Sequence, residues 1–438
     1  MSLIMKSAKN HMITDEMKTI AEKERINVNQ LMKRIEKGRV IITRNIRRDN
    51  VIPIGIGEGL DIKVNANIGT SADVCNINDE IEKAKIAVKY GSDTIMDLST
   101  GKDIKKTRNA ILKAINVPIG TVPIYEVGIN MLNANKAIVD MTEDDLFNII
   151  IEQAKSGVDF MTIHCGVNKR IVENLKKNPR NLGMVSRGGT FLAAWIVHNG
   201  KENPYYKDYD YLLEIAKEYD FSISLGDGLR PGTIFDGSDW AQFEELLNIS
   251  RLVKRSRKKN IQVMVEGPGH LPLDQIKYNM EIQKSVCDGA PFYVLGPLCT
   301  EIAPGYDHIV CAIGGAIAGM AGADFLCYVT PSEHLGLPNL NDVKEGVIAT
   351  KIAAHSANIV RRGSLASYKD LEMSKARARL DWEKQFELAI DSERAKSIYT
   401  RAKLQGYIED ETKPCTMCGK FCAIKILQKY IGKSTFNL

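Results

Sequence analysis

The chain has 438 residues, of which 44% are hydrophobic and 26% are charged, a composition typical of a soluble globular protein with a substantial core. Its formal net charge of +5 suits a small anionic ligand and is too weak to favour a nucleic acid partner. Nine irregularly spaced cysteines, no signal peptide and no apolar run long enough to cross a bilayer argue against a secreted disulfide scaffold and a membrane protein. We therefore expect a cytoplasmic protein.

Residues 1–55 are rich in Lys and Arg with helical periodicity, and we predict a small N-terminal helical segment without a site. Over residues 56–363, short runs rich in Val, Ile and Phe alternate with longer amphipathic segments, which is typical of repeated βα units. We predict an α/β fold here, a (β/α)8 TIM barrel that forms the catalytic domain. Nine candidate strands compete for the eight places of such a barrel, so one is misassigned or additional: 62–68, 94–98, 119–124, 160–164, 184–186, 221–225, 261–265, 292–295 and 325–329.

Polar or glycine-rich residues follow each candidate strand. A TIM barrel carries its chemistry at the C-terminal ends of its strands and on the loops that follow them. We therefore expect these residues to meet at one mouth of the barrel. They include Asn67, Met96, Tyr125, His164, Ser186, Arg187, Asp227, Arg230, Glu266, His270 and His334.

Two glycine-rich loops, residues 186–189 and 227–232, are predicted to hold an anion. Their glycines expose backbone N–H groups, and each loop carries an arginine that can bind a carboxylate or phosphate through two hydrogen bonds. Each loop alone is equally consistent with a tight turn that carries a surface arginine. Their repetition after neighbouring strands favours the anion site.

Histidines and acidic residues in the same loops are the other candidates for chemistry. His270 and His334 could converge on a metal ion over the barrel mouth, with His164 and His308 as competitors and simple hydrogen bonding as the alternative role. Glu266 and Asp227 could accept protons or hold a substrate, or could form a structural ion pair. The remaining cysteines of this region are predicted to be small buried hydrophobic residues: Cys75, Cys165, Cys287, Cys299, Cys311 and Cys327.

After the barrel we predict a helical C-terminal domain over residues 364–408 and a cluster-binding arm over residues 409–438. The domain is expected to contain one long helix over 374–390 and a second near 392–406, and a mobile polar linker over 409–414 is expected to follow. The arm carries Cys415, Cys418 and Cys422. Three thiolates so closely spaced can hold three irons of a 4Fe-4S cluster and leave the fourth iron open. The alternatives are a zinc site completed by a distant histidine, or ordinary thiols.

Several long motifs resemble the phosphomethylpyrimidine synthase family, and the likeness covers about residues 50–425. The resemblance implies a radical S-adenosylmethionine enzyme that converts 5-aminoimidazole ribotide into 4-amino-5-hydroxymethyl-2-methylpyrimidine phosphate for thiamin biosynthesis. It implies a 4Fe-4S cluster on the three tail cysteines, with S-adenosylmethionine at the open iron. The motifs are 186–189, Ser224-Leu-Gly-Asp-Gly-Leu-Arg-Pro-Gly232, Glu266-Gly-Pro-Gly-His270, 290–297, 302–308 and Cys327-Tyr-Val-Thr-Pro-Ser-Glu-His-Leu-Gly-Leu-Pro338.

The resemblance also implies site residues and partners. A second metal, commonly zinc, maps onto His270 and His334. The family forms homodimers in which the cluster arm reaches over the partner's active site, and an electron donor such as a flavodoxin or a ferredoxin is expected. Substrate contacts map onto Asn67, Met96, Tyr125, His164, Ser186, Arg187, Gly188, Asp227, Gly228, Leu229, Arg230, Glu266 and Tyr293, with Glu266 also a catalytic candidate.

Two other functions stay open at this point. The relative 5-hydroxybenzimidazole synthase uses the same substrate and cluster but makes the lower-ligand base of a cobamide. A metal-binding regulatory barrel without turnover is the alternative from a different class, although such a protein has no need of converging Arg, Asp, Glu and His side chains. The chain also departs from the family in two respects. Its second cysteine gap is one residue shorter than the C-x2-C-x4-C of much of the family, and we expect it to lack the long N-terminal domain of the larger members.

Overall fold

The computed structural model describes residues 3–406 and 414–432 of the chain. The chain divides into two compact units, Met1–Arg361 and Arg362–Leu438, and each unit is described by itself. The predicted domain borders at residues 55, 363 and 408 stay predictions. Apart from Pro414, the predicted linker lies outside the described residues.

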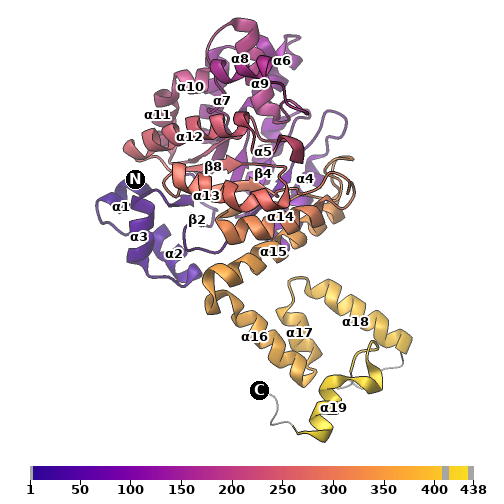
Figure 1. The fold of residues 1–438 in the computed structure, drawn as a ribbon. Coiled ribbons are helices and arrows are strands. Elements are labelled where there is room, and N and C mark those ends of the chain that lie inside the picture. Colours follow the sequence, from indigo (N-terminus) through magenta and orange to yellow (C-terminus); the bar gives the residue numbers. More distant parts are fainter. Residues whose placement is uncertain (1–2, 407–413, 433–438) are drawn as a thin grey trace. The chain divides into compact units, whose positions relative to one another are not determined.

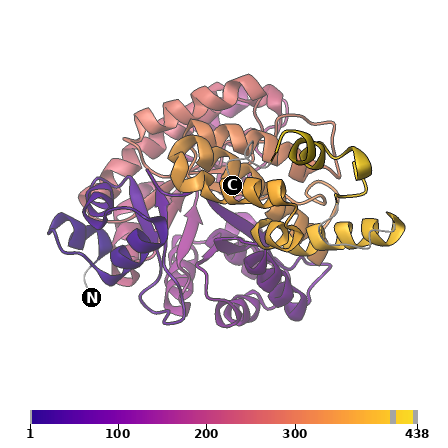
Figure 2. The ribbon, with the colours of Figure 1, turned by 90° about the horizontal axis from the view of Figure 1, so that it is seen from below.

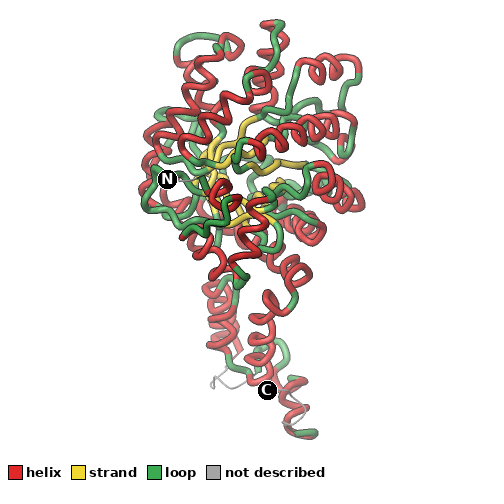
Figure 3. The backbone as a smooth tube through the Cα atoms, turned by 90° about the vertical axis from the view of Figure 1, so that its left-hand side faces the viewer, coloured by secondary structure: helices red, strands yellow, loops and turns green. Residues whose placement is uncertain are grey.

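The first unit is built around a closed barrel of eight parallel strands, which confirms the predicted fold class. Figure 3 shows these strands at the centre, with helices around them. The barrel closes because the last strand pairs with both the first and the preceding one. Its strands are β3 (Lys63–Ile68), β4 (Thr94–Asp97), β5 (Ile119–Thr121), β6 (Phe160–Ile163), β7 (Ser222–Leu225), β8 (Val263–Gly267), β9 (Phe292–Leu295) and β10 (Phe325–Cys327).

Helices follow the strands and bury their apolar faces against the barrel. They are α4 (Ile77–Lys89), α5 (Ile104–Ala114), α6 (Pro123–Asn133), α7 (Glu143–Ser156), α8 (Lys169–Lys177), α9 (Arg187–Asn199), α10 (Pro204–Lys207), α11 (Tyr209–Tyr219), α12 (Trp240–Lys258), α13 (Ile276–Val286), α14 (Asp307–Ala321) and α15 (Leu340–Arg362). Short 3-10 turns are η1 (Ile138–Asp140), η2 (Ile234–Asp236) and η3 (Leu273–Gln275). The part of the chain that the structure describes contains no helix long and apolar enough to cross a membrane.

Helix α7 illustrates how local sequence sets the ends of these helices. The Thr142 hydroxyl accepts the backbone N–H of Asp145, and the Asp145 carboxylate accepts the backbone N–H of Thr142, which together form a capping box. Gly157 ends the helix in the left-handed region at φ 98°. Local sequence signals, a capping box and a C-terminal glycine, therefore determine where this helix begins and ends.

Aromatic rings fill the inside of the barrel below its mouth. Phe325 stacks on Tyr293 with 4.3 Å between ring centroids, and its edge meets Phe160 at 6.2 Å. Gly120 leaves room for this packing, since a Cβ at that position would lie 2.2 Å from the Phe160 ring. The filled interior forces any ligand to bind above it, at the ends of the strands.

The ninth candidate strand, 184–186, was a misassignment. Its last residue, Ser186, is the N-cap of α9, and its hydroxyl accepts the backbone N–H of Gly189. The candidate over 119–124 is also shorter than expected, because Pro123 begins helix α6.

The N-terminal segment closes the opposite end of the barrel. It contains α1 (Ile4–Lys9), α2 (Asp15–Glu24) and α3 (Val28–Glu36), which lie together beside the barrel in Figures 1 and 2. Strands β1 (Val40–Thr43) and β2 (Ile54–Gly57) form a separate antiparallel pair, which the helical prediction for residues 1–55 missed. The segment also forms hydrogen bonds with residues that precede barrel strands. For example, the backbone of Ile42 pairs with the side-chain amide of Gln262, which precedes β8.

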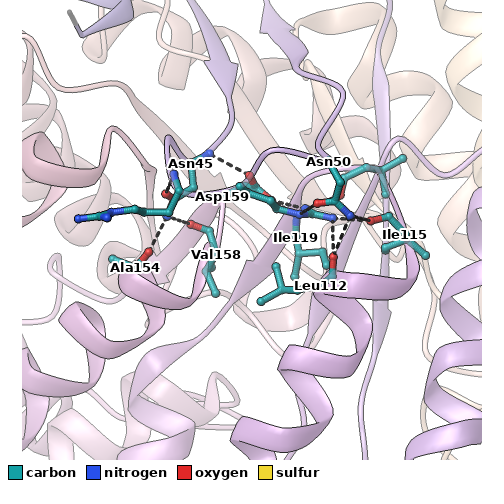
Figure 4. Close-up of polar contacts among 11 residues, drawn as sticks. Asn45, Asn50, Leu112, Ile115, Ile119, Ala154, Val158 and Asp159 are labelled. Carbon is teal, nitrogen blue, oxygen red and sulfur yellow. Dashed lines mark hydrogen bonds and ion pairs between the residues drawn. The ribbon is translucent and has the colours of Figure 1, made fainter. Parts of the chain in front are cut away.

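A buried ion pair fastens this segment to the barrel (Figure 4). Arg48 donates to the Asp159 carboxylate at 2.6 Å, and Asp159 also accepts the backbone N–H groups of Asn45 and Ile119. Arg48 donates further to backbone carbonyls, including that of Ile115. Asp159 is fully buried, and burial raises the pKa of its carboxyl to about 6 against the pull of Arg48. These contacts hold the N-terminal segment to residues that precede the barrel strands, at the end opposite the mouth.

The second unit is helical, as predicted. Its helices are α16 (Ser364–Arg379), α17 (Trp382–Leu388), α18 (Ser392–Gly406) and α19 (Ala423–Tyr430), with a 3-10 turn η4 (Gly419–Phe421). The prediction of one long helix over 374–390 was wrong. Leu380 adopts the left-handed conformation at φ 57° and ends α16, and Asp381 then caps α17 by accepting the backbone N–H of Lys384.

Candidate active site

A cavity of about 500 Å³ opens among the C-terminal ends of the barrel strands, a size suited to a small-molecule ligand. Predicted site residues that line it are Asn67, Met96, Tyr125, His164, Arg187, Asp227, Arg230, Glu266 and Tyr293. Four further predicted residues are not part of its lining: Ser186 and Gly188 lie at the start of α9, and Gly228 and Leu229 lie in the loop after β7. The structure therefore brings the strand-end residues together as expected, although Tyr125 belongs to helix α6 rather than to a loop.

A carboxylate on β8, that of Glu266, lines this cavity. The Thr162 hydroxyl donates to Glu266 Oε1 at 2.5 Å, and the Ser224 hydroxyl donates to the same oxygen at 3.2 Å. The two hydroxyls come from neighbouring strands, because Thr162 on β6 pairs with Ser224 on β7. These bonds fix the rotamer of Glu266. The other oxygen, Oε2, accepts a long bond from the Asp227 backbone N–H, at 3.4 Å.

A second carboxylate, that of Asp227, forms an ion pair with Arg230. Arg230 donates to Asp227 Oδ1 at 3.2 Å, three residues along the same loop. Burial raises the pKa of Asp227 well above its usual range, and the nearby charge of Glu266 adds to this shift while Arg230 opposes it. Burial also raises the pKa of Glu266. Two carboxyl groups with raised pKa values beside one guanidinium are suited to hold and exchange a proton.

A third buried carboxylate holds the loop that carries Asp227 and Arg230. Glu245 of helix α12 accepts the backbone N–H of Gly228 at 2.9 Å and that of Leu229 at 2.8 Å. The other predicted loop, 186–189, is the N-cap and first turn of α9. It touches the Asp227 loop, since a Cβ added to Gly189 would lie 2.5 Å from the Cα of Gly228. The two predicted anion loops are thus packed directly against each other.

Replacing Glu245 with glutamine is expected to loosen this loop. Above about pH 8, where the wild-type carboxyl is ionised, it is expected to weaken ligand binding about tenfold, because one amide oxygen replaces two carboxylate oxygens that each accept an N–H group. Burial raises the pKa of Glu245 to about 8 in the folded chain, so its ionisation costs stability as pH rises from its unfolded value through 8. The wild type's stability advantage over the variant should therefore shrink over that pH range. Calorimetric binding of the ribotide and urea unfolding at two pH values check this, with Glu244→Gln on the same helix as the control. Unchanged affinity in Glu245→Gln would show that the loop does not need its carboxylate.

A neutral histidine lies beneath the first of these loops. His164 Nε2 lies 3.0 Å from the hydroxyl of Ser186, the N-cap of α9. Burial lowers the pKa of His164 to about 3, and the charge of Arg230 adds to this shift, so the ring is neutral at physiological pH. Gly188 is required here, since a Cβ at that position would lie 2.3 Å from the imidazole. The first turn of α9 therefore lies beside an uncharged ring. Arg187 is the first residue of this helix, and its guanidinium carbon lies 5.0 Å from the centre of the Tyr125 ring.

The opposite wall of the cavity is an amide and thiol network. Asn65 donates to Asn67 and to the Tyr293 hydroxyl, both at 2.8 Å, and Asn67 donates to Cys327 Sγ at 3.0 Å. Burial raises the pKa of Cys327 to about 12, so it is a thiol. Cys327 is buried, as predicted, and it also borders the cavity, whereas Cys299 is only partly buried. Cys75 was also misjudged, because its side chain is exposed.

The predicted histidine pair does come together. The His270 and His334 ring centroids are 5.8 Å apart. Two imidazoles that bind one tetrahedral metal through Nε2 have centroids about 5 Å apart, given metal–nitrogen bonds near 2.0–2.1 Å, so a small side-chain adjustment suffices. Within residues 3–406 and 414–432 no group of three or more His, Cys, Asp or Glu side chains is placed to hold a metal ion. A metal at this pair would therefore keep positions for non-protein ligands.

The three tail cysteines lie around one compact turn in the second unit. Gly419 N–H bonds the carbonyl of Cys415 at 3.0 Å, Phe421 N–H bonds that of Cys418 at 2.9 Å, and Cys422 precedes α19. All three thiols are free. Their sulfurs are not gathered as a metal site in the described residues, but three unbridged thiols on one turn fit the donor set of an iron–sulfur cluster.

Known protein families were compared with the whole chain, which includes both the barrel and the cysteine tail. The family model described as the radical SAM ThiC family matches residues 3–429. The chain belongs to the radical SAM ThiC family.

Curated members of the ThiC family resemble this chain over almost their whole length. Phosphomethylpyrimidine synthase of Methanocaldococcus jannaschii is 56% identical, covering 98% of this chain and 99% of that protein. The same enzyme of Pyrococcus furiosus is 56% identical over 98% of both chains, and that of Caldanaerobacter subterraneus is 53% identical over 97% of both. Among solved structures, a dihydropteroate synthase from Coxiella burnetii aligns with a TM-score of 0.39 at 13% identity, covering 73% of this chain and 99% of that one.

Sequence patterns alone missed several residues of this ThiC-family site. Thr162 and Ser224 lie within otherwise apolar strands. A hydroxyl at a position that faces the barrel interior is the sequence signal that could have identified them. Glu245 lies in a long charged helix and looks like a surface residue until the fold turns it inward. His164 is in the cavity and not with the histidine pair, and His308 is on helix α14.

Proposed function

We propose that this chain is a phosphomethylpyrimidine synthase, which rearranges 5-aminoimidazole ribotide into 4-amino-5-hydroxymethyl-2-methylpyrimidine phosphate in the cytoplasm. The observation that carries this proposal is the 56% identity to enzymes of that name over 98% of the chain. The cavity supports it, because it combines arginines, carboxylates and amides at the end of a closed barrel. A regulatory barrel without turnover has no use for this lining.

The ribotide phosphate is proposed to bind at the start of α9. A helix N-terminus offers free backbone N–H groups and a partial positive charge to an anion. Arg187 is the first residue of that helix, and Arg230 lines the same cavity from the neighbouring loop. The neutral His164 and Ser186 support the turn from below without adding charge.

The ribose and the imidazole are then proposed to lie between the carboxylates and the amide wall. Glu266, whose Oε1 is held by Thr162 and Ser224, lines the cavity and is proposed to accept a hydrogen bond from a ribose hydroxyl through Oε2. Its raised pKa allows it to accept and return a proton during bond rearrangement. Asn67 and Tyr293, with Met96, line the cavity around the base. Gly228 and Leu229 act through their backbone, which holds the Asp227 loop.

Cys415, Cys418 and Cys422 are proposed to hold a 4Fe-4S cluster with S-adenosylmethionine at its open iron. When bound, the cluster supplies the single electron that cleaves S-adenosylmethionine and so starts radical chemistry on the ribose. A flavodoxin or a ferredoxin is the proposed electron donor. His270 and His334 are proposed to bind a divalent cation such as zinc, for which two imidazole nitrogens are suitable ligands.

The chain is further proposed to work as a homodimer whose cluster arm serves the partner's barrel. Mixing Cys418→Ala chains with Arg230→Met chains tests this, because each variant alone is expected to be inactive. If the arm acts across the dimer, a mixed dimer keeps one intact barrel with one intact arm, and random exchange restores about a quarter of wild-type activity. Exchange confirmed by mass spectrometry with no recovered activity would contradict the shared site.

Identification of the product tests the proposed function itself. The chain is reconstituted anaerobically with iron and sulfide and then given the ribotide, S-adenosylmethionine and a reductant. Pyrimidine phosphate together with 5′-deoxyadenosine supports the proposal. 5-Hydroxybenzimidazole would replace the proposed product with that of the related synthase, and a reaction without 5′-deoxyadenosine would contradict both.

A further inference from the structure

The loop between β9 and α14 supplies a carboxylate to each histidine of the pair. His270 follows β8 and His334 follows β10, so the two imidazoles come from different parts of the barrel. His270 Nδ1 lies 3.0 Å from Glu301 Oε1, and His334 Nδ1 lies 2.9 Å from Asp307 Oδ1. One segment of chain, between Gly296 and Asp307, therefore sets the orientation of both rings.

Both carboxylates are themselves held in place. Glu301 Oε1 also accepts the backbone N–H of Ile234 at 2.8 Å, and Asp307 Oδ2 accepts that of Gly305 at 3.2 Å. Asp307 is buried at the first position of α14, where the helix dipole favours its negative charge. These contacts limit the positions that the carboxylates can take.

The loop is also fastened to the backbone beside the first histidine. Leu298 N–H bonds the carbonyl of Gly269 at 2.7 Å, and Leu271 N–H bonds the carbonyl of Leu298 at 3.0 Å. His270 and Leu298 thus form a parallel β-bridge on either side of these bonds. These backbone bonds fasten the loop that carries Glu301 to the residues on either side of His270.

The hydrogen bonds at Nδ1 leave Nε2 of each ring available to bind a metal ion. A carboxylate can only accept, so in the neutral form of either imidazole Nδ1 carries the hydrogen and Nε2 keeps its lone pair. Metal-binding histidines in proteins are commonly oriented in this way by a carboxylate. With the centroids 5.8 Å apart, both rings are close to the spacing that a shared metal requires.

We propose that Glu301 and Asp307 are positioning residues that prepare His270 and His334 to bind one divalent cation through Nε2. This inference rests on the metal site of the proposed function. The competing view is that the two contacts serve only to hold the loop in place. In that case their loss changes stability but leaves the affinity for the metal unchanged.

Zinc affinity of the full-length chain distinguishes the two views. Cys415, Cys418 and Cys422 are first changed to serine, so that the tail thiols cannot bind the probe. Zinc ions are then titrated against a chromogenic chelator in Glu301→Gln, Asp307→Asn, His270→Ala and His334→Ala. Asp274→Asn is the matched control, because it removes one exposed carboxylate from the β8–α13 loop.

Each carboxylate variant is expected to bind zinc ~10–100-fold more weakly, and Asp274→Asn is expected to bind it as the parent does. Partial recovery in Asp307→Glu would agree with a carboxylate requirement. If the histidine variants lose zinc but Glu301→Gln and Asp307→Asn keep the parent affinity, the positioning role is wrong and the metal site stands. If the histidine variants keep the parent affinity, the metal site itself is wrong.

The tautomer provides a readout that a purely structural role does not change. In the zinc-free chain labelled with ¹⁵N-histidine, His270 and His334 are expected to show the Nδ1–H form. In Glu301→Gln and Asp307→Asn the amide can donate as well as accept, so the partner ring should shift toward the Nε2–H form. Unchanged ¹⁵N shifts in both variants would contradict the proposal.

Discussion

Replacing Cys418 with alanine is expected to abolish pyrimidine formation and the visible spectrum of the iron–sulfur cluster. Cys415, Cys418 and Cys422 are the three cysteines around the tail turn, and the proposed cluster has no spare thiolate there. The barrel is a separate compact unit with its own core, so its fold should not depend on the tail thiol. The variant should therefore still bind the ribotide. Absorption spectra after anaerobic reconstitution, turnover and calorimetric ribotide binding measure the three properties.

Cys75→Ala is the matched control for this experiment. Cys75 is an exposed cysteine of the barrel unit, and its replacement should leave both the spectrum and turnover unchanged. Retention of full turnover in Cys418→Ala would show that the cluster assignment is wrong. Loss of ribotide binding together with turnover would instead indicate that the thiol supports the fold.

Replacing Arg48 with methionine is expected to produce the largest loss of stability in the barrel unit, ~3–5 kcal/mol, because it leaves a buried carboxylate without its cation. Asp159 is fully buried and would keep only its backbone N–H donors from Asn45 and Ile119. The side chain of Arg48 also binds carbonyls such as that of Ile115, whose loss adds to the effect. Urea unfolding followed by circular dichroism gives the change in the barrel transition.

The pH dependence of this loss has a definite sign. Burial already raises the pKa of Asp159 to about 6, above its unfolded value, so its ionisation costs stability as pH rises through 6. Removing Arg48 raises that pKa further, so the stability gap between wild type and variant should widen from pH 5.5 to pH 8. The exposed neighbour Arg47, changed to methionine, is the control. A loss below ~1 kcal/mol at pH 8 would contradict a structural role for the pair.

The sequence predicted the barrel well because its signal is repeated. Each apolar run with a polar or glycine-rich end marks one βα unit, and the eight strands of the barrel were all among the candidates. The segment at 184–186 could not be separated from a strand, since three residues before a capped helix carry no periodicity. The β1–β2 pair was hidden because it joins residues 40–43 to 54–57 across a stretch with no hairpin motif.

Site residues could be predicted where charged or imidazole side chains stand beside glycines in the sequence. They could not be predicted where a side chain's role depends on which residues the fold brings into contact with it. Arg187, Asp227 and His270 stand out beside glycines in the sequence. Glu245 and Cys327 do not, because their roles depend on which residues the barrel places within reach. The contacts of Glu301 and Asp307 with the histidines likewise need a loop that returns across the barrel mouth.

Transfer of deuterium tests most directly the central claim, that this chain couples cleavage of S-adenosylmethionine to rearrangement of the ribotide. The reconstituted chain is given 5-aminoimidazole ribotide deuterated on the ribose carbons, and the mass of the 5′-deoxyadenosine formed is measured. We predict that 5′-deoxyadenosine gains deuterium from the labelled ribotide and gains none when unlabelled ribotide reacts in its place. 5′-Deoxyadenosine that forms at the same rate without deuterium would contradict the account.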